Sequence, residues 1–318
     1  MARFFYIFFN KVFIALYVLI NYIRYFFSHI KTLPSKTRTF IGSALILIIM
    51  ISMLTYFIDT SSIKVSGNDN LNNAYDQLNK NRLNPAYDSF MKALKAFDED
   101  KNIRGIYLTS EHLGDLEISR NNIMNALTHY DRALNIAQDM DYPQGQINLL
   151  IKYAKIKIKL NRPNAARIHY NDALKIAQTI NSPKSISTLY TYIGNLEREG
   201  GNPEKARDAY QNALEIYRAD NDVLGEANLH WNIGYLEFTL KNHDAALQSY
   251  QLARSLFQQS KDPLNEAHVV KYMARLENNF GNKIKSTTYY RQAETLYQAV
   301  GNTDQITALR SEAGQLLL

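Results

Sequence analysis

The sequence contains no cysteine among its 318 residues. This absence excludes disulfide bonds, thiol catalysis and cysteine-ligated metal sites, and it is compatible with either an oxidising or a reducing compartment. The sequence also lacks a phosphate-binding glycine loop, a paired-histidine motif with metal-ligand spacing, and a nucleophile elbow. We therefore expect no catalytic residues, no metal and no cofactor, and we predict that the protein is not an enzyme.

Acidic residues are absent from residues 1–58. The basic residues of this segment are Arg3, Lys11, Arg24, Lys31, Lys36 and Arg38. The whole chain has 36 basic and 30 acidic residues, so these six account for the net charge of +6 and residues 59–318 are neutral. A protein that binds nucleic acid would carry its positive charge on the folded domain that contacts the phosphates. We therefore do not expect nucleic acid as a partner.

Residues 39–58 form a run without any charged side chain. About 20 such residues cross the ~30 Å hydrocarbon core of a bilayer as a helix, so we predict a transmembrane helix here. Lys31, Lys36 and Arg38 precede the run, and the positive-inside rule keeps that side in the cytoplasm. A cleaved signal peptide is the alternative, but no Ala-x-Ala-like site follows Ile58. We predict an integral membrane protein of the bacterial inner membrane, with the rest of the chain on the periplasmic, non-cytoplasmic side.

Residues 1–38 form a second hydrophobic segment, which carries a narrow polar stripe and ends in a basic loop. Polar or basic side chains recur every seven residues, at Arg3, Asn10, Tyr17, Arg24 and Lys31. Two interpretations of residues 4–30 remain open. The helix either lies in the interface with its stripe toward lipid headgroups, or spans the bilayer with its stripe toward a partner helix. Residues 59–70 are polar with Gly and Ser, and we interpret them as a linker.

A pattern with a period of 40 residues occupies the remainder of the chain, residues 71–318. Its most regular feature is an aromatic residue, found as Phe90, Tyr130, Tyr170, Tyr210, Tyr250 and Tyr290. Small residues stand four positions before and three positions after each aromatic residue, which places all three on one face of a helix. Another small residue lies sixteen positions before five of the aromatic residues, as Gly114, Ala154, Gly194, Gly234 and Ala274. Each period therefore contains two helices.

The loops between these helices have their own signals. Residues that tolerate a left-handed backbone stand between paired helices, at Asn81, Asn121, Asn161, Gly201 and Gly281. Prolines fall in the first turns of several helices, where the missing N–H costs little. A fixed period of this length predicts a solenoid in which neighbouring units bury each other's apolar faces. We predict thirteen helices, namely six pairs over residues 71–300 and a capping helix from Thr303 to Leu317.

The pattern resembles the tetratricopeptide repeat. The first helix carries the family's Leu-Gly-type pair at Leu113-Gly114, Ile193-Gly194 and Ile233-Gly234, and the second helix carries its Ala and aromatic residue four positions apart. The period of 40 exceeds the family's usual length of about 34, and Glu or Lys replaces the first-helix Tyr, as in Glu197 and Glu237. These departures indicate the longer-helix class of the family. The resemblance implies an all-α, right-handed α-solenoid, here preceded by hydrophobic membrane helices.

The resemblance also implies a binding groove lined by the first helices. Three positions around the small residue of each first helix point into that groove in the family. In one helix these positions hold Trp231, Tyr235 and Phe238, which form a single stripe. An aromatic stripe at helical spacing can instead belong to the core, but Ile233, Gly234 and Leu236 already account for the core face. We therefore predict that the stripe lines the groove.

Cationic and amide side chains accompany the stripe. The predicted partner-binding residues are Trp231, Tyr235, Phe238, Asn195, Arg198, Asn228, Lys271, Arg275 and Lys155. Aromatic anchors beside cations suit a protein or peptide segment that bears acidic groups, and amides offer both a donor and an acceptor to its backbone. The carboxylates of Glu197 and Glu199, near a helix end, are expected to be solvated.

The predicted function is that of a membrane-anchored scaffold or adaptor, which binds a protein or peptide partner and helps to assemble or regulate an envelope complex. One alternative is a structural subunit of a membrane complex, held mainly through its N-terminal helices. A cytoplasm-facing receptor is another, if the topology is reversed. The sequence does not define the oligomeric state.

Overall fold

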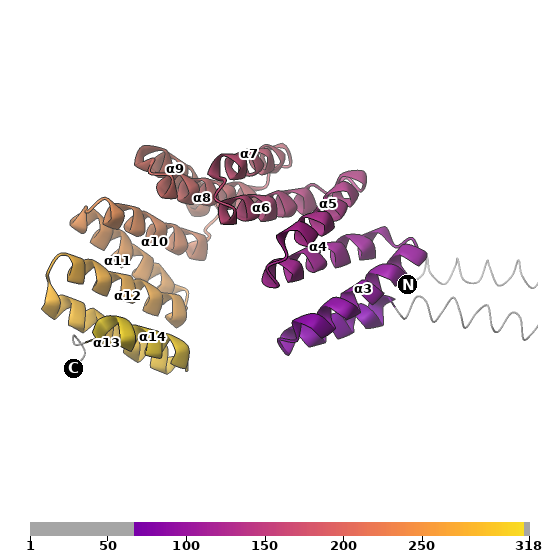
Figure 1. The fold of residues 1–318 in the computed structure, drawn as a ribbon. Helices are drawn as coiled ribbons and strands as arrows, with labels where there is room; N and C mark the ends of the chain where they lie inside the picture. Colours follow the sequence, from indigo (N-terminus) through magenta and orange to yellow (C-terminus); the bar gives the residue numbers. More distant parts are fainter. Residues whose placement is uncertain (1–66, 315–318) are drawn as a thin grey trace, which may run out of the picture. The chain divides into compact units, whose positions relative to one another are not determined.

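The computed structural model describes residues 67–314 (Figure 1). Within this range the regular structure is helical, with twelve helices from α3 to α14 and a helical stretch at 67–79. The all-α array and its thirteen helices are thus confirmed for this part of the chain. Residues 67–70, which we assigned to the linker, are helical, so the first helix begins before Leu71.

The predicted membrane segments, residues 1–38 and 39–58, lie outside the described residues, as do residues 59–66 of the linker. Between residues 67 and 314, no helix combines the length and the apolar character that a membrane crossing needs.

The helices follow one another with short loops of three residues. Eleven helices have 17 residues each and α14 has 11. Their bounds are α3 Leu83–Glu99, α4 Ile103–Ser119, α5 Ile123–Asp139, α6 Pro143–Lys159, α7 Pro163–Thr179, α8 Pro183–Glu199, α9 Pro203–Ala219, α10 Val223–Thr239, α11 His243–Gln259, α12 Pro263–Asn279, α13 Lys283–Ala299 and α14 Thr303–Ala313.

The loops between the helices have the conformations that the sequence predicts. The middle residue of each loop has a positive φ, as in Asn121 (61°) and Asn161 (55°) between paired helices and Asn181 (49°) between units. This left-handed residue ends one helix and redirects the chain into the next. Prolines stand at the N-terminal positions of α6, α7, α8, α9 and α12. Exact 20-residue spacing of helix ends therefore follows from local sequence.

The chain divides into two compact units, one ending at Gly105 and the other starting at Ile106. In the described part of the first unit, Phe90 is fully buried and meets the ring of Tyr75 edge-on, with centroids 5.6 Å apart. The second unit contains most of α4 and all of α5 to α14, and every candidate site residue belongs to it.

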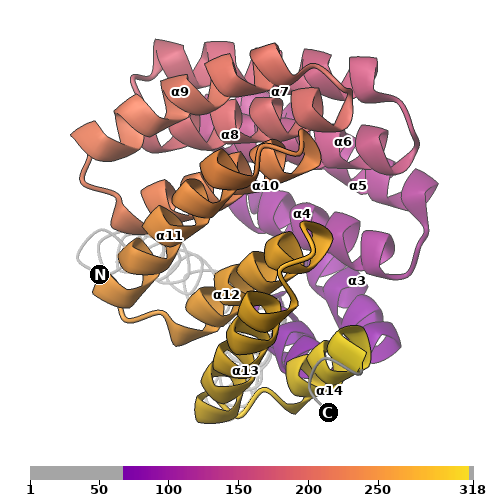
Figure 2. The ribbon, with the colours of Figure 1, turned by 90° about the vertical axis from the view of Figure 1, so that its left-hand side faces the viewer.

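In the second unit, each helix from α5 to α14 packs against the next along the chain. Figure 2 shows this succession for α10 to α13. The repeated tyrosines are at most 2% exposed, and three of them pack directly on a glycine of the preceding helix. A Cβ added at Gly194 or Gly234 would lie 2.4 or 2.6 Å from the ring of Tyr210 or Tyr250. The small residue is therefore needed because the ring occupies the space of a side chain.

Candidate functional site

The aromatic stripe lies on α10 and is neither fully buried nor fully exposed. Trp231 and Phe238 pack with one side against the core cluster that contains Tyr250, and the rings of Tyr235 and Phe238 are 6.2 Å apart. The stripe is thus supported by the core while part of each ring stays accessible. Its contact with a ligand stays a prediction.

Tyr272 of α12 joins the stripe into a larger aromatic surface. Its ring meets that of Trp231 at 5.4 Å and that of Tyr235 at 5.8 Å, both edge-to-face. The ring of Tyr250 lies 6.2 Å from Tyr272 on the core side. Edge-to-face contacts at these distances are favourable arrangements for aromatic rings.

Tyr272 is not among the predicted contact residues, and it stands two positions before the small residue Ala274. The same position in other units also reaches the repeated tyrosine of the preceding unit. Tyr192 stacks on Tyr170 at 5.5 Å, and the Lys152 ammonium lies 5.6 Å from the ring of Tyr130. A repeat alignment that included this position would have identified Tyr272.

Two arginines flank the aromatic surface. The guanidinium of Arg198 lies 4.8 Å from the ring centroid of Tyr235, and that of Arg275 lies 4.8 Å from the ring centroid of Tyr272. Cations over aromatic rings are attracted by the negative face of the ring. We refer to Trp231, Tyr235, Tyr272, Arg198 and Arg275 as the aromatic–arginine cluster.

The arginines also have polar partners inside the protein. Arg198 is only 12% exposed, and it donates to Asn195 at 3.2 Å and pairs with Glu199 at 3.3 Å. Arg275 donates two hydrogen bonds of 2.5 Å to Glu312, which lies on α14. The hydrogen bond with Glu312 raises the pKa of Arg275, although burial acts in the opposite direction. The predicted capping helix therefore contributes a carboxylate beside the cluster.

The remaining predicted contact residues have partners within the protein. Asn195 accepts from Tyr210 at 2.7 Å, so its amide oxygen already has an internal partner, and Asn228 donates to a carbonyl of its own helix. Lys155 lies 4.9 Å from the ring of Tyr192. Lys271 lies 5.8 Å from the ring of Tyr297 and donates to Gln305, and its pKa is lowered by burial and by Arg275. The structure thus brings together the three aromatic residues and two of the cations.

The prediction that Glu197 is solvated is wrong. We predicted a solvated carboxylate, but Glu197 is 4% exposed and accepts hydrogen bonds from Arg167 at 2.6 Å and Asn202 at 2.9 Å. Glu199 has a side chain that is 57% exposed, as predicted. Burial disfavours the charge of Glu197, but the two hydrogen bonds outweigh it and hold the pKa below its ordinary value. Glu197 therefore joins α8 to the preceding helix α7.

The same arrangement recurs where Glu replaces the first-helix Tyr of the family. Glu237 accepts from Arg207 at 2.9 Å and from Asn242 at 2.7 Å. Glu277 accepts from Asn282 at 2.6 Å, and the Nε2 atom of His243 lies 3.4 Å from its carboxylate. A buried glutamate thus links neighbouring units at several junctions, with a histidine in place of the arginine at one of them.

This histidine should make one junction sensitive to pH. The hydrogen bond with Asp244 raises the pKa of His243 above its ordinary value, and the nearby carboxylate of Glu277 acts in the same direction, although burial opposes both. The stabilisation is complete below the unfolded pKa and is lost as the pH rises through the raised folded pKa. We expect the free energy of unfolding, from urea titrations, to decrease modestly across that window. A His243→Gln variant should lack this decrease, and an identical slope in the variant would contradict the assignment.

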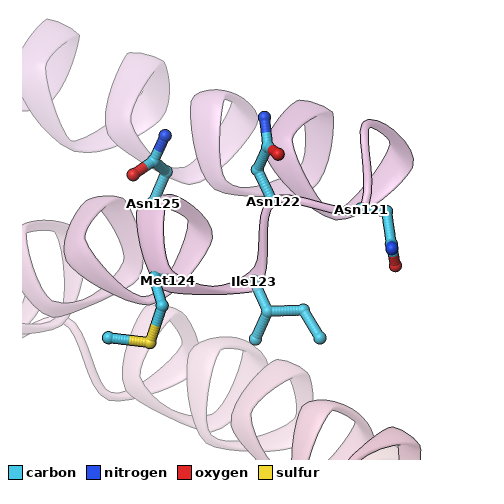
Figure 3. Close-up of a pocket in the computed structure, with 5 residues that line it drawn as sticks. All are labelled: Asn121, Asn122, Ile123, Met124 and Asn125. Atoms are coloured by element: carbon cyan, nitrogen blue, oxygen red, sulfur yellow. The ribbon is translucent and has the colours of Figure 1, made fainter.

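A shallow depression lies along Asn121–Asn125, where α5 begins (Figure 3). Figure 3 shows Asn122 and Asn125 on one side of the chain and Ile123 and Met124 on the other. Asn121 accepts from Lys159 at 2.8 Å and Asn122 donates to Glu117 at 2.7 Å, so both amides have internal roles. No group of metal-ligating side chains occurs within residues 67–314. We assign no site to this depression.

Comparison with known proteins agrees with this architecture. A family model described as tetratricopeptide repeat matches residues 184–259, which include nearly all of α8 and the whole of α9 to α11. No curated protein matches the sequence.

Solved structures share the fold at low sequence identity. BtubC from P. vanneervenii has a TM-score of 0.60 and 18% identity, covering 69% of this chain and 92% of its own. A STAND protein with a tetratricopeptide repeat sensor, PH0952 from Pyrococcus horikoshii, has a TM-score of 0.61 and 16% identity, covering 93% of this chain and 47% of its own. A Rap protein complexed with competence and sporulation factor has a TM-score of 0.55 and 10% identity, covering 79% and 75%. Residues 184–259 thus match the tetratricopeptide repeat, and the described array is similar in fold to these structures.

Proposed function

We propose that the protein is a scaffold that binds an acidic segment of a protein partner at the aromatic–arginine cluster. The observation that carries this proposal is the pair of arginines held 4.8 Å over the rings of Tyr235 and Tyr272, beside the half-buried Trp231. Aromatic residues and arginines dominate the energies of protein interfaces, because they bury large rigid surfaces and donate several hydrogen bonds. A Rap protein of similar fold has been solved with a bound factor, which supports a binding role.

The arginines favour an acidic ligand for a geometric reason. A guanidinium stacked on a ring uses its face for the aromatic contact and leaves its N–H edge for hydrogen bonds in its own plane. Carboxylates match that edge because they accept two parallel bonds. Glu312 already binds Arg275 in this way, with both of its oxygens at 2.5 Å, so a partner's carboxylate would take the place of Glu312 in that geometry.

Selection of random phage-displayed peptides on the full chain in bilayer nanodiscs tests this proposal. We expect enrichment of peptides that carry acidic residues and that compete with one another for one site. Enrichment of peptides without acidic residues, or no enrichment at all, would contradict the proposed ligand class.

We further propose that residues 39–58 anchor the protein in a bacterial inner membrane, with the repeats in the periplasm. The uncharged run and the basic residues before it support this arrangement. A tether concentrates the repeats near other membrane components, so a modest affinity is sufficient to assemble or regulate an envelope complex.

A reporter fused after Leu318 should reveal this topology. Alkaline phosphatase is expected to be active in the fusion, and green fluorescent protein, which reports the cytoplasm, is expected to be dark. The matched control deletes residues 39–58 from the same fusions. A fluorescent full-length fusion without phosphatase activity would place the repeats in the cytoplasm and favour the receptor alternative.

A further inference from the structure

Three of the repeated tyrosines donate their hydroxyl groups to side-chain acceptors. Tyr130 donates to Asp115 at 2.6 Å, and Tyr210 donates to Asn195 at 2.7 Å. Asp115 and Asn195 occupy the same repeat position, one residue after the small residue of the first helix. Two other units hold a lysine or an arginine at this position, and Tyr290 donates instead to Glu312 of α14 at 2.9 Å.

Tyr250 departs from this pattern. Its side chain is fully buried, and its hydroxyl has no hydrogen-bond partner among the described residues. The acceptor position of this unit holds Tyr235, whose ring contacts Arg198 and Tyr272 instead. A buried hydroxyl without a partner destabilises the folded state, and such groups are rare in native proteins.

The charged side chains near the Tyr250 hydroxyl favour an anionic acceptor. Its ring lies beside Tyr272, and the charges of Arg198 and Arg275 both act on its ionisation. Burial raises the pKa of Tyr250 well above its ordinary value, although both arginines act in the other direction. The hydroxyl therefore stays protonated and acts as a donor, and the nearby cations favour a negatively charged acceptor over a neutral one.

We propose that Tyr250 is a specificity-determining residue of the aromatic–arginine cluster, and that its hydroxyl donates to a carboxylate of the bound partner. The partner supplies the acceptor that Asp115 and Asn195 supply in other units. The hydroxyl is buried, so a partner reaches it only when a covering side chain turns aside, and the neighbouring rings of Tyr235 and Tyr272 are only partly buried. This inference rests on the proposed function, because it concerns the same site and the same class of ligand.

A Tyr250→Phe variant tests the inference, since it removes the hydroxyl and keeps the buried ring. The probe is a hexaglutamate peptide, titrated by calorimetry against the full chain in nanodiscs, with hexaglutamine as the neutral control. We expect the variant to bind hexaglutamate about tenfold more weakly, the usual effect of losing a hydrogen bond to a charged group. Its melting temperature should be unchanged or higher, because an unpartnered buried group has been removed.

Tyr130→Phe is the matched control, because the hydroxyl of Tyr130 has an internal acceptor, Asp115. This variant should melt at a lower temperature while its affinity for hexaglutamate stays within about twofold of the wild type. The Tyr250→Phe variant is therefore expected to lose affinity without losing stability, whereas the control variant is expected to lose stability without losing affinity.

Three outcomes would overturn the inference. One is a lower melting temperature of Tyr250→Phe with unchanged affinity, which would mean that the hydroxyl is bonded inside the protein. Another is unchanged affinity of Tyr250→Phe while Trp231→Ala loses binding, which would leave the proposed function standing. Failure of the wild type to bind hexaglutamate would remove the anion site, and the peptide selection would then decide the proposed function separately.

Discussion

Replacing Trp231 with alanine is expected to weaken binding of an acidic partner peptide by about 2 kcal/mol, which is about thirtyfold. Trp231 contacts Tyr272 edge-to-face and stacks parallel to the ring of His268, so it is held rigidly before a ligand arrives. A rigid aromatic side chain contributes contact area at a small entropic cost. Calorimetric titration of the full chain with peptides from the selection measures the effect.

Two controls separate binding from folding in this experiment. Trp231→Phe keeps an aromatic side chain and should lose less affinity than the alanine variant. Ile284→Ala removes a side chain that is 85% exposed on α13, and should leave the affinity unchanged. Because Trp231 also packs on the core, thermal unfolding should verify that its variants are folded. Full affinity in a folded Trp231→Ala variant would contradict the proposed site.

An Arg207→Ala variant should lose about 2–3 kcal/mol of unfolding free energy. Glu237 is 7% exposed, and without Arg207 its charge would remain buried with Asn242 as its remaining partner in this arrangement. Breaking a buried ion pair from one side usually costs about 3–5 kcal/mol, and we expect less here because Arg207 is 38% exposed. Urea unfolding of the full chain measures the loss.

A second substitution at the same pair provides the control. Arg207→Ala combined with Glu237→Gln removes the uncompensated charge and should recover part of the stability. Arg218→Ala breaks the pair with Glu226, in which Arg218 is 54% exposed, and should cost at most about 1 kcal/mol. Equal losses in Arg207→Ala and Arg218→Ala would mean that burial of the glutamate is not what makes the junction strong.

Acid should weaken the Glu237 junction in a defined direction. Burial alone would raise the pKa of Glu237, but the hydrogen bonds from Arg207 and Asn242 lower it overall. A carboxylate with a lowered folded pKa stabilises the protein above the unfolded pKa, and this contribution is lost as the pH falls through the folded pKa. The His243 junction responds at higher pH and with the opposite sign, so the two types of junction are distinguishable.

The architecture was predictable because its signals are local and repeated. The residues that end helices, such as Asn121 and Asn161, adopt the left-handed conformation that the sequence indicates. The repeated tyrosines are buried, and three of their rings pack on a glycine of the preceding helix. Each feature depends on a few neighbouring residues, and the same residue pattern recurs in successive repeats of the sequence.

The candidate site was harder to predict because its contacts cross between units. Helical spacing identified the stripe of Trp231 and Tyr235, yet it did not show that Tyr272 of the next unit completes the aromatic surface. The sequence likewise gave no sign that Glu312 of α14 would bind Arg275, since the pair is separated by 37 positions. Side-chain direction across helices decides such contacts, and it depends on packing rather than on spacing.

The buried glutamates show the same limit. Near the end of a helix, Glu197 has the local sequence of a solvated residue, yet Arg167 of the preceding helix and Asn202 of the loop enclose its carboxylate. The informative signal was the replacement of the family's first-helix tyrosine by glutamate in several units. A charged residue that recurs where an apolar one is usual indicates a recurring partner.

The fluorescence of Trp231 provides the most direct test of the account, because it is the only tryptophan in the chain. The full chain in nanodiscs should be titrated with a selected acidic peptide that contains no tryptophan. We expect a saturable change in emission, with the same dissociation constant as calorimetry and with competition by hexaglutamate. Calorimetric binding of the peptide without any change in tryptophan emission would contradict a binding site at the aromatic–arginine cluster.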